Sequence, residues 1–202
     1  IAGYEVVMRD IEKELVNDGY DQIEWSLGKL AEKNQIEEDA DTVLDRVSTT
    51  VDLEAAVADA DLVIEAAPED LDIKRDVFAD VDAATGAETI MATNTSSLRV
   101  SDIATATDRP EYVCGMHFFN PPVKMDLVEV VSGEQTRADV VDAGIEFVES
   151  LEKTPIRVRK DVPQFVVNNV LTPLMGEAAF MLDEGDVEIQ DVDAAMVFQR
   201  GY

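Results

Sequence analysis

The chain has 202 residues, of which 46% are hydrophobic, enough for one medium-sized domain or for a domain and the beginning of another. Its 44 acidic residues outnumber the 16 basic ones along the whole length and give a formal net charge of −28. Nucleic acids and anionic membranes are bound by clustered Lys and Arg, so this balance argues against both partners. A solvated acidic surface is also typical of adaptation to high salt, and we expect a halophilic protein.

A cytoplasmic protein is expected from the cysteine usage and the hydropathy pattern. Cys114 lies in an apolar run over residues 112–119, where we expect it to be a small core residue, and one cysteine cannot form an intramolecular disulfide. No apolar stretch approaches the roughly 20 residues that span a bilayer, and the first residues show no signal-peptide pattern.

Predicted strands and helices alternate over the first 160 residues. In chain order, strands are expected at 3–10, 47–53, 61–67, 89–93, 112–119, 127–132 and 156–159. Helices are expected at about 11–30, 53–60, 70–83, 101–106 and 137–153. The nearly continuous apolar run at 61–67 predicts a strand that is buried on both faces of a parallel sheet. This alternation predicts a doubly wound, mostly parallel α/β sheet.

The pattern changes near Asp161. Strand signals stop there, and two apolar helices are expected at 164–183 and 188–199. The sequence therefore predicts an α/β domain over 1–160 and the beginning of an all-α domain over 161–202.

Asp10 ends the first predicted strand, where an acid of a dinucleotide-binding fold accepts hydrogen bonds from ribose hydroxyls. The alternative is a surface Asp that caps a helix starting at Ile11. The glycine-rich loop of such folds lies roughly 20 residues upstream of the acid, whereas nine residues precede Asp10. We therefore expect the nucleotide-binding domain to be incomplete at its N-terminus, without the loop that places a pyrophosphate on a helix.

His117, the one histidine of the chain, lies at the end of an apolar strand, where a lone His is more often structural than catalytic. Twelve positions further on, Glu129 lies within the apolar run Leu-Val-Glu-Val. An unpaired buried carboxylate is costly, and a neighbouring imidazolium would offset that cost. The two residues are therefore a candidate acid–base pair.

Several motifs together resemble the NAD-dependent 3-hydroxyacyl-CoA dehydrogenase family over essentially the whole chain. They are His-Phe-Phe-Asn-Pro at 117–121, Leu-Val-Glu-Val at 127–130, Val-Ile-Glu-Ala-Ala-Pro-Glu-Asp at 63–70, Ala-Thr-Asn-Thr-Ser-Ser-Leu at 92–98 and Phe-Val-Val-Asn at 165–168. The chain departs from the family at Gln164 and Asn169, where Gly and Arg are usual. The resemblance implies a Rossmann-type NAD-binding domain followed by a helical domain for substrate binding and homodimerisation.

The resemblance also implies roles for individual residues. His117 would be the general base of the reaction and Glu129 the acid that orients it, with Ser96 and Asn168 binding the substrate oxygen. NAD would be bound by Asp10, Ala66, Glu69, Lys74, Ser96 and Asn120. The substrate, an acyl-CoA, would be contacted by Ser26, Lys33, Ser96 and Asn168, and no metal is implied.

Simpler interpretations remain open for some of these residues. Residues 94–97 are also typical of a strand-to-helix turn, and Asn168 is also suited to capping or cross-linking helices. Lys74, like Ser26 and Lys33 on one helix face, is also typical of a solvated helix surface.

The implied activity is oxidation of (S)-3-hydroxyacyl-CoA by NAD, as in fatty-acid β-oxidation. The missing glycine-rich loop leaves open a non-catalytic acyl-CoA-binding or assembly subunit, or a fragment of an active enzyme.

Overall fold

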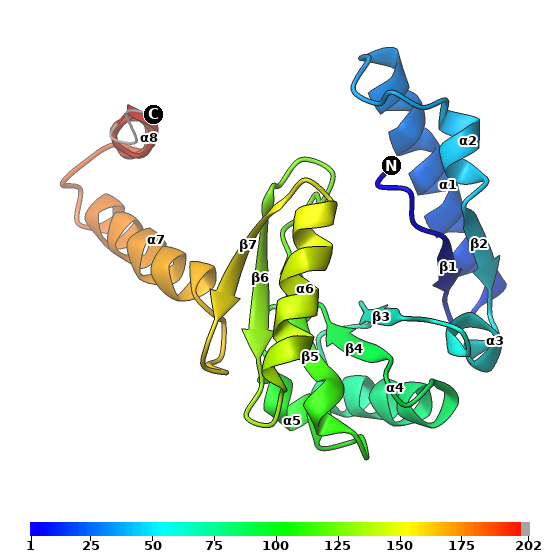
Figure 1. Cartoon of the computed structure of the whole chain (residues 1–202). Coiled ribbons are helices and arrows are strands. Elements are labelled where there is room, and N and C mark those ends of the chain that lie inside the picture. Colours follow the sequence, from blue (N-terminus) through cyan, green and yellow to red (C-terminus); the bar gives the residue numbers. More distant parts are fainter. Residues whose placement is uncertain (199–202) are drawn as a thin grey trace. The chain divides into compact units, whose positions relative to one another are not determined.

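The computed structural model describes residues 1–198 and divides the chain into two compact units, Ile1–Asp161 and Val162–Tyr202 (Figure 1). The first unit holds two parallel or mostly parallel sheets and the helices that connect their strands. The second unit consists of α7 (Val167–Asp183) and α8 (Ile189–Phe198).

The smaller sheet pairs β1 (Val6–Arg9) with β2 (Val47–Thr50) in parallel. The connection between them contains α1 (Lys13–Glu32) and α2 (Ala40–Leu44), and α3 (Leu53–Val57) follows β2. A core formed by Leu27, Val43 and Leu44 joins α1 to α2.

The larger sheet has five strands in the order β3-β4-β5-β6-β7. Its strands are β3 (Leu62–Glu65), β4 (Ile90–Thr93), β5 (Val113–Phe118), β6 (Leu127–Ser132) and β7 (Thr154–Val158). Its helices are α4 (Leu71–Ala84), α5 (Val100–Ala104) and α6 (Ala138–Ser150), with a 3-10 turn at Pro110–Tyr112. Neighbouring strands are parallel except β5 and β6, which are antiparallel. The mostly parallel α/β sheet predicted from the sequence is confirmed.

Helices cover both faces of the five-stranded sheet. A Cβ atom added at Gly115 would lie 2.9 Å from a Val100 methyl, so α5 packs on the face that Gly115 shares with His117. A Cβ atom added at Gly144, in α6, would lie 2.9 Å from the Met116 methyl. Because Gly115 and Met116 point to opposite faces of β5, α6 packs on the other face of the sheet.

Two sequence predictions differ from the structure, and two short elements were not predicted. The strand expected to be buried on both faces, β3, is half-exposed, with Ile64 38% exposed, because β3 pairs with one strand, β4. The helix predicted over 164–183, α7, begins at Val167 and not at Gln164, because Gln164 and Phe165 have positive φ angles that no α-helix contains. The helix α2 and the 3-10 turn are additional elements. The predicted end of the final helix at Gln199 lies outside the described residues.

Among residues 1–198, no helix is both long and apolar enough to cross a membrane.

Candidate active site

His117 and Glu129 face each other across the antiparallel strands β5 and β6 as direct register partners. Nδ1 of His117 is 2.7 Å from Oε2 of Glu129, a hydrogen-bonding distance. The His117 side chain is 5% exposed and that of Glu129 is 0% exposed. An ionised carboxylate accepts hydrogen bonds and does not donate them, so with Glu129 ionised Nδ1 carries the hydrogen and donates it to Glu129.

The alternation of apolar residues explains why these two side chains meet. Met116 and Val130, beside His117 and Glu129 in the strands, belong to the cores on the α6 face. Successive side chains of a strand point to opposite faces, so His117 and Glu129 share the α5 face. The ring of Phe119 lies 4.5 Å from the His117 ring, centroid to centroid, with the two ring planes tilted by 53°.

A residue not predicted from the sequence, Asn94, helps to hold the end of β5. Its Oδ1 accepts a hydrogen bond of 2.8 Å from the backbone N–H of Phe118, which follows His117. Asn94 lies just after β4, so its side chain ties the carboxyl ends of β4 and β5 together.

Glu69 connects the turn between β3 and α4 to the turn after β4. Its Oε1 accepts hydrogen bonds from Thr95 Oγ1 (2.6 Å) and from the backbone N–H groups of Ser96 (3.0 Å) and Ser97 (2.8 Å). Burial raises the pKa of Glu69, but the hydrogen bonds from Thr95, Ser97 and Ser96 lower it by a larger amount, so that the pKa falls to about 2. Glu69 therefore remains ionised at neutral pH. Its hydrogen bond with the Ser96 N–H brings two of the predicted cofactor residues into contact.

Lys74 is buried, with its side chain 1% exposed. The interpretation of Lys74 as a solvated helix residue is therefore wrong. Its Nζ lies 2.7 Å from Glu65 Oε1 and 3.6 Å from Glu69 Oε2. Glu65 is not among the residues predicted from the sequence, although it carries the signal that identified Glu129: an acid within an apolar strand.

Asp10 directly follows β1, and its Oδ1 accepts a hydrogen bond of 2.6 Å from the Ile11 N–H. Helix α1 begins at Lys13 with Glu12 as its N-cap, so the interpretation of Asp10 as the cap of a helix starting at Ile11 is wrong. Its place at the end of a parallel strand is the one that a ribose-binding acid occupies.

Three further predicted residues follow the parallel strands of the larger sheet. Ala66 follows β3, Ser96 lies after β4 and Asn120 lies after β5, and all three are exposed. The carboxyl ends of neighbouring parallel strands share one edge of a sheet, so these residues and His117 gather at that edge.

The remaining predicted residues lie on helices. Ser26 is half-buried in α1, and the exposed Lys33 is the C-cap of that helix, so the two lie near one helix face. Asn168 belongs to the second unit, in the first turn of α7. The adjacent Asn169 donates from Nδ2 to the carbonyls of Pro163 and Phe165 and so fixes the start of that helix.

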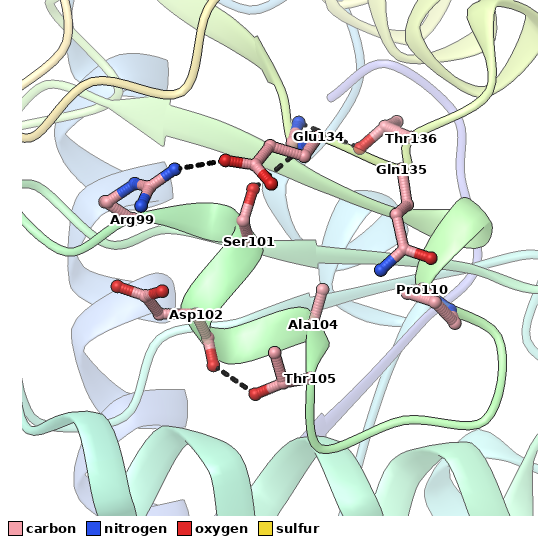
Figure 2. A pocket seen from close by; sticks show the side chains of 10 residues that line it. Arg99, Ser101, Asp102, Ala104, Thr105, Pro110, Glu134, Gln135 and Thr136 are labelled. Carbon is pink, nitrogen blue, oxygen red and sulfur yellow. Dashed lines mark hydrogen bonds and ion pairs between the residues drawn. The ribbon is translucent and has the colours of Figure 1, made fainter.

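A pocket of about 120 Å³ lies between α5 and the turn after β6 (Figure 2). Arg99, Ser101 and Glu134 line it, and Ser101 Oγ accepts a hydrogen bond of 2.8 Å from the Glu134 N–H. Because β6 is antiparallel to β5, this turn lies at the sheet edge opposite to His117. The pocket contains none of the predicted site residues and is separate from the candidate active site.

Comparison with known proteins identifies the family. The 3-hydroxyacyl-CoA dehydrogenase NAD binding domain matches residues 1–162, and the C-terminal domain of the same family matches residues 165–202. The chain belongs to the 3-hydroxyacyl-CoA dehydrogenase family. By that membership it is an NAD-dependent 3-hydroxyacyl-CoA dehydrogenase, and its nucleotide-binding domain is an NAD-binding domain, as the sequence motifs implied.

Individual members of the 3-hydroxyacyl-CoA dehydrogenase family agree with this assignment. A probable 3-hydroxybutyryl-CoA dehydrogenase from Deinococcus radiodurans is 41% identical over 195 residues, which are 96% of this chain and 69% of that protein. The mitochondrial hydroxyacyl-coenzyme A dehydrogenase of Sus scrofa is 36% identical over 207 residues, with 100% of this chain and 66% of that protein covered. The chain thus spans about two thirds of the length of these relatives.

Solved structures show the same fold. The (S)-3-hydroxybutyryl-CoA dehydrogenase from Ralstonia eutropha superposes with a TM-score of 0.93 at 35% identity, covering 100% of this chain and 71% of that one.

The residues at the strand ends fit NAD. The Asp10 carboxylate suits the ribose hydroxyls of NAD and would repel a 2′-phosphate. The ionised Glu69 and the hydroxyl of Ser96 add acceptor and donor groups at the edge shared by β3, β4 and β5. In the described part of the chain, no group of three or more His, Cys, Asp or Glu side chains is arranged to hold a metal ion.

Proposed function

We propose that the protein oxidises (S)-3-hydroxyacyl-CoA thioesters to 3-oxoacyl-CoA with NAD, in fatty-acid β-oxidation or a related pathway, and that His117 and Glu129 are its catalytic pair. The observation that carries this proposal is the buried hydrogen bond of 2.7 Å between His117 Nδ1 and Glu129 Oε2. An imidazole oriented by a carboxylate in this way is the arrangement by which enzymes make histidine a general base.

Each catalytic side chain has one task in the proposed reaction. Because Nδ1 of His117 donates to Glu129, we assign proton transfer to Nε2, which takes the proton of the substrate 3-hydroxyl. The Glu129 carboxylate stabilises the imidazolium that results. Bound NAD would supply the acceptor for the hydride of C3, and the loss of one proton and one hydride would leave a ketone. In the reverse direction, the protonated ring returns its proton to the alkoxide.

Neutral side chains complete the proposed site. The Ser96 hydroxyl and the Asn168 amide would hold the substrate oxygen without adding charge. Asp10, Ala66, Glu69, Lys74 and Asn120 would form the cofactor site, and Ser26 and Lys33 would contact the coenzyme A moiety.

We further propose that the protein works as a homodimer in a salt-rich cytoplasm.

The relatives indicate which substrate to test first. Both the Deinococcus and Ralstonia proteins carry the name 3-hydroxybutyryl-CoA dehydrogenase. We therefore propose short-chain 3-hydroxyacyl-CoA thioesters as substrates, with 3-hydroxybutyryl-CoA as the test compound.

The decisive experiment compares the wild-type full-length protein with its His117→Gln variant. Loss of a general base typically lowers turnover by about 10²- to 10⁴-fold, and we expect a fall of this size with unchanged affinity for NADH. Gln135→Ala, at the separate pocket of Figure 2, is the control and should behave as wild type. A His117→Gln turnover within tenfold of wild type would exclude His117 from the reaction. Acyl-CoA binding without any NADH binding by the wild type would instead indicate a non-catalytic subunit.

A further inference from the structure

Glu65 is the last residue of β3, and its carboxylate lies in the interior with 4% of the side chain exposed. One oxygen, Oε2, accepts a hydrogen bond of 2.7 Å from the hydroxyl of Thr93, the register partner of Glu65 on β4. The other, Oε1, accepts hydrogen bonds from Lys74 Nζ (2.7 Å) and from the backbone N–H of Ala67. Glu65 thus joins the ends of two strands to the turn that follows β3.

Lys74 reaches this turn from the first part of helix α4. Its Nζ donates to Glu65 Oε1 and to the Ala67 carbonyl at 2.9 Å, and it lies 3.6 Å from Glu69 Oε2. An ammonium group has three donors, and three protein oxygens surround this one. The side chain is therefore occupied inside the protein, beneath the turn that carries Ala66 and Glu69.

Glu69 connects Lys74 to a second turn, the one that follows β4. Its Oε2 faces Lys74, while its Oε1 accepts the hydrogen bonds from Thr95, Ser96 and Ser97. A continuous chain of contacts therefore runs from Glu65 through Lys74 and Glu69 to Ser96.

Stability alone is a poor explanation for this buried pair. The desolvation of two charges offsets most of their attraction, and apolar residues of similar size often replace such pairs without loss of stability. Such a pair is better explained by the groups that it holds in position, because those groups shift when the charges are removed.

We propose that Glu65 and Lys74 are positioning residues for the cofactor site, whose buried ion pair holds the β3–α4 turn and the β4–α5 turn in the geometry that binds the nicotinamide half of NAD. The inference rests on the proposed function in so far as NAD binds at these turns. It gives Lys74, in addition to its place in the proposed cofactor site, a positioning role through Glu69 and Ala67.

The test measures the Kd of NADH by fluorescence titration and the melting temperature, in the full-length protein and three variants. Glu65→Gln leaves Lys74 without its main counter-charge, and Lys74→Met leaves Glu65 unpaired. The double variant Glu65→Gln/Lys74→Met removes both charges. Small displacements of binding groups cost on the order of 10- to 100-fold, and we expect NADH affinity to fall by about tenfold or more in all three variants.

The double variant separates positioning from general stability. It leaves no unpaired buried charge, so its melting temperature should rise above that of Lys74→Met, whereas its NADH affinity should remain low. Asp82→Asn is the matched control. It breaks the Asp82–Arg109 ion pair (2.7 Å) elsewhere in the same unit, and it should lower the melting temperature without changing the Kd of NADH.

Two results would overturn the inference. If NADH affinity recovers together with the melting temperature in the double variant, the pair is only structural. If Glu65→Gln binds NADH within twofold of wild type while Lys74→Met does not, the ion pair does not position the turns and Lys74 acts on the cofactor alone. Absence of NADH binding by the wild-type protein would instead refute the proposed function itself.

Discussion

Glu129 lies directly opposite His117, on the strand pair where the direction of the sheet reverses. Antiparallel strands can be joined by a short loop, whereas parallel neighbours need a crossover of a dozen or more residues. The reversal therefore lets residues twelve positions apart in the sequence become register partners. It also brings the first part of β6 to the sheet edge where the parallel strands β3, β4 and β5 end.

Replacing Glu129 by Gln should reduce turnover far more than it reduces cofactor binding. An amide in place of the carboxylate can no longer stabilise an imidazolium, and it can donate to Nδ1 and so favour the wrong tautomer of His117. We expect kcat to fall by about 10²- to 10⁴-fold, with the Kd of NADH unchanged. Steady-state kinetics of the full-length protein provide the measurement, with the exposed Glu149→Gln on α6 as control. A kcat within tenfold of wild type would contradict the orienting role.

The low pKa of Glu69, about 2, predicts an acid-sensitive contribution to stability. Since an unfolded Glu titrates near pH 4.3, the folded state binds this proton more weakly than the unfolded state. Glu69 therefore stabilises the native protein above about pH 5, and this contribution disappears as the pH falls from about 5 to 2.

Melting curves of the wild type and Glu69→Gln measure this effect. The difference in melting temperature should be largest near neutral pH and should shrink below pH 5. A difference that stays constant down to the acid limit of folding would show that ionisation of Glu69 is unimportant. Glu177→Gln, an exposed acid on α7, should show no such trend.

The fold was largely predictable because its signals are local. The apolar runs that became β3, β5 and β6 identify strands on their own, and alternation with helices predicts a mostly parallel sheet. The helix α2 has five residues, too few for a helical period to show, although Asp39 caps it by accepting a hydrogen bond from the Asp41 N–H. Neither the exposed face of β3 nor the late start of α7 follows from local sequence, because neighbouring strands and backbone angles decide them.

The candidate site was predictable to the extent that its residues carry recognisable motifs. Glu65 is a residue whose partner could not be predicted from the sequence. An acid within an apolar strand indicates a buried partner for Glu65 as clearly as it does for Glu129. The identity of that partner, Lys74, depends on how α4 folds back against β3, and no spacing rule provides this. The same is true of the hydrogen bond between Asn94 and Phe118.

Replacing Gln164 by Gly should stabilise the protein. Gln164 has a φ of 65°, in the left-handed region that costs a residue with a side chain about 1 kcal/mol or more and costs glycine nothing. After the greater flexibility of glycine in the unfolded chain is subtracted, a net gain of about 0.5 kcal/mol remains. Urea unfolding measures it, and a lower midpoint for Gln164→Gly would show that the Gln164 side chain makes a compensating contact.

Cys114 should react with thiol reagents only when the protein unfolds. Its side chain is fully buried in the core formed with Ala92, Met116 and Val140, and burial raises the pKa of the thiol to about 12. The thiolate, which is the reactive form, is then present at roughly one part in 10⁴ at pH 8. Labelling with a disulfide reagent should be complete in denaturant and negligible in buffer. Rapid labelling of the native protein would contradict this burial.

Salt should raise the melting temperature. A net charge of −28 produces strong self-repulsion, and the screening length falls from about 10 Å at 0.1 M salt to about 3 Å at 1 M. Exposed ion pairs such as Lys29–Glu32 are weakened by the same screening, but each contributes little. Thermal unfolding in 0.1 M and 2 M KCl tests the balance. An unchanged or lower melting temperature at 2 M would remove the argument for adaptation to high salt.

The position of β6 between β5 and β7 has a consequence for how activity is lost on heating. Its backbone is bonded to a neighbour on each side, so Glu129 cannot leave His117 through fraying of an edge. Separation of the two side chains requires the middle of the sheet to open, which belongs to the highest-energy class of fluctuations. The acid–base pair should therefore persist until the whole α/β unit melts, and partial loosening near β1 and β2 would weaken cofactor binding first.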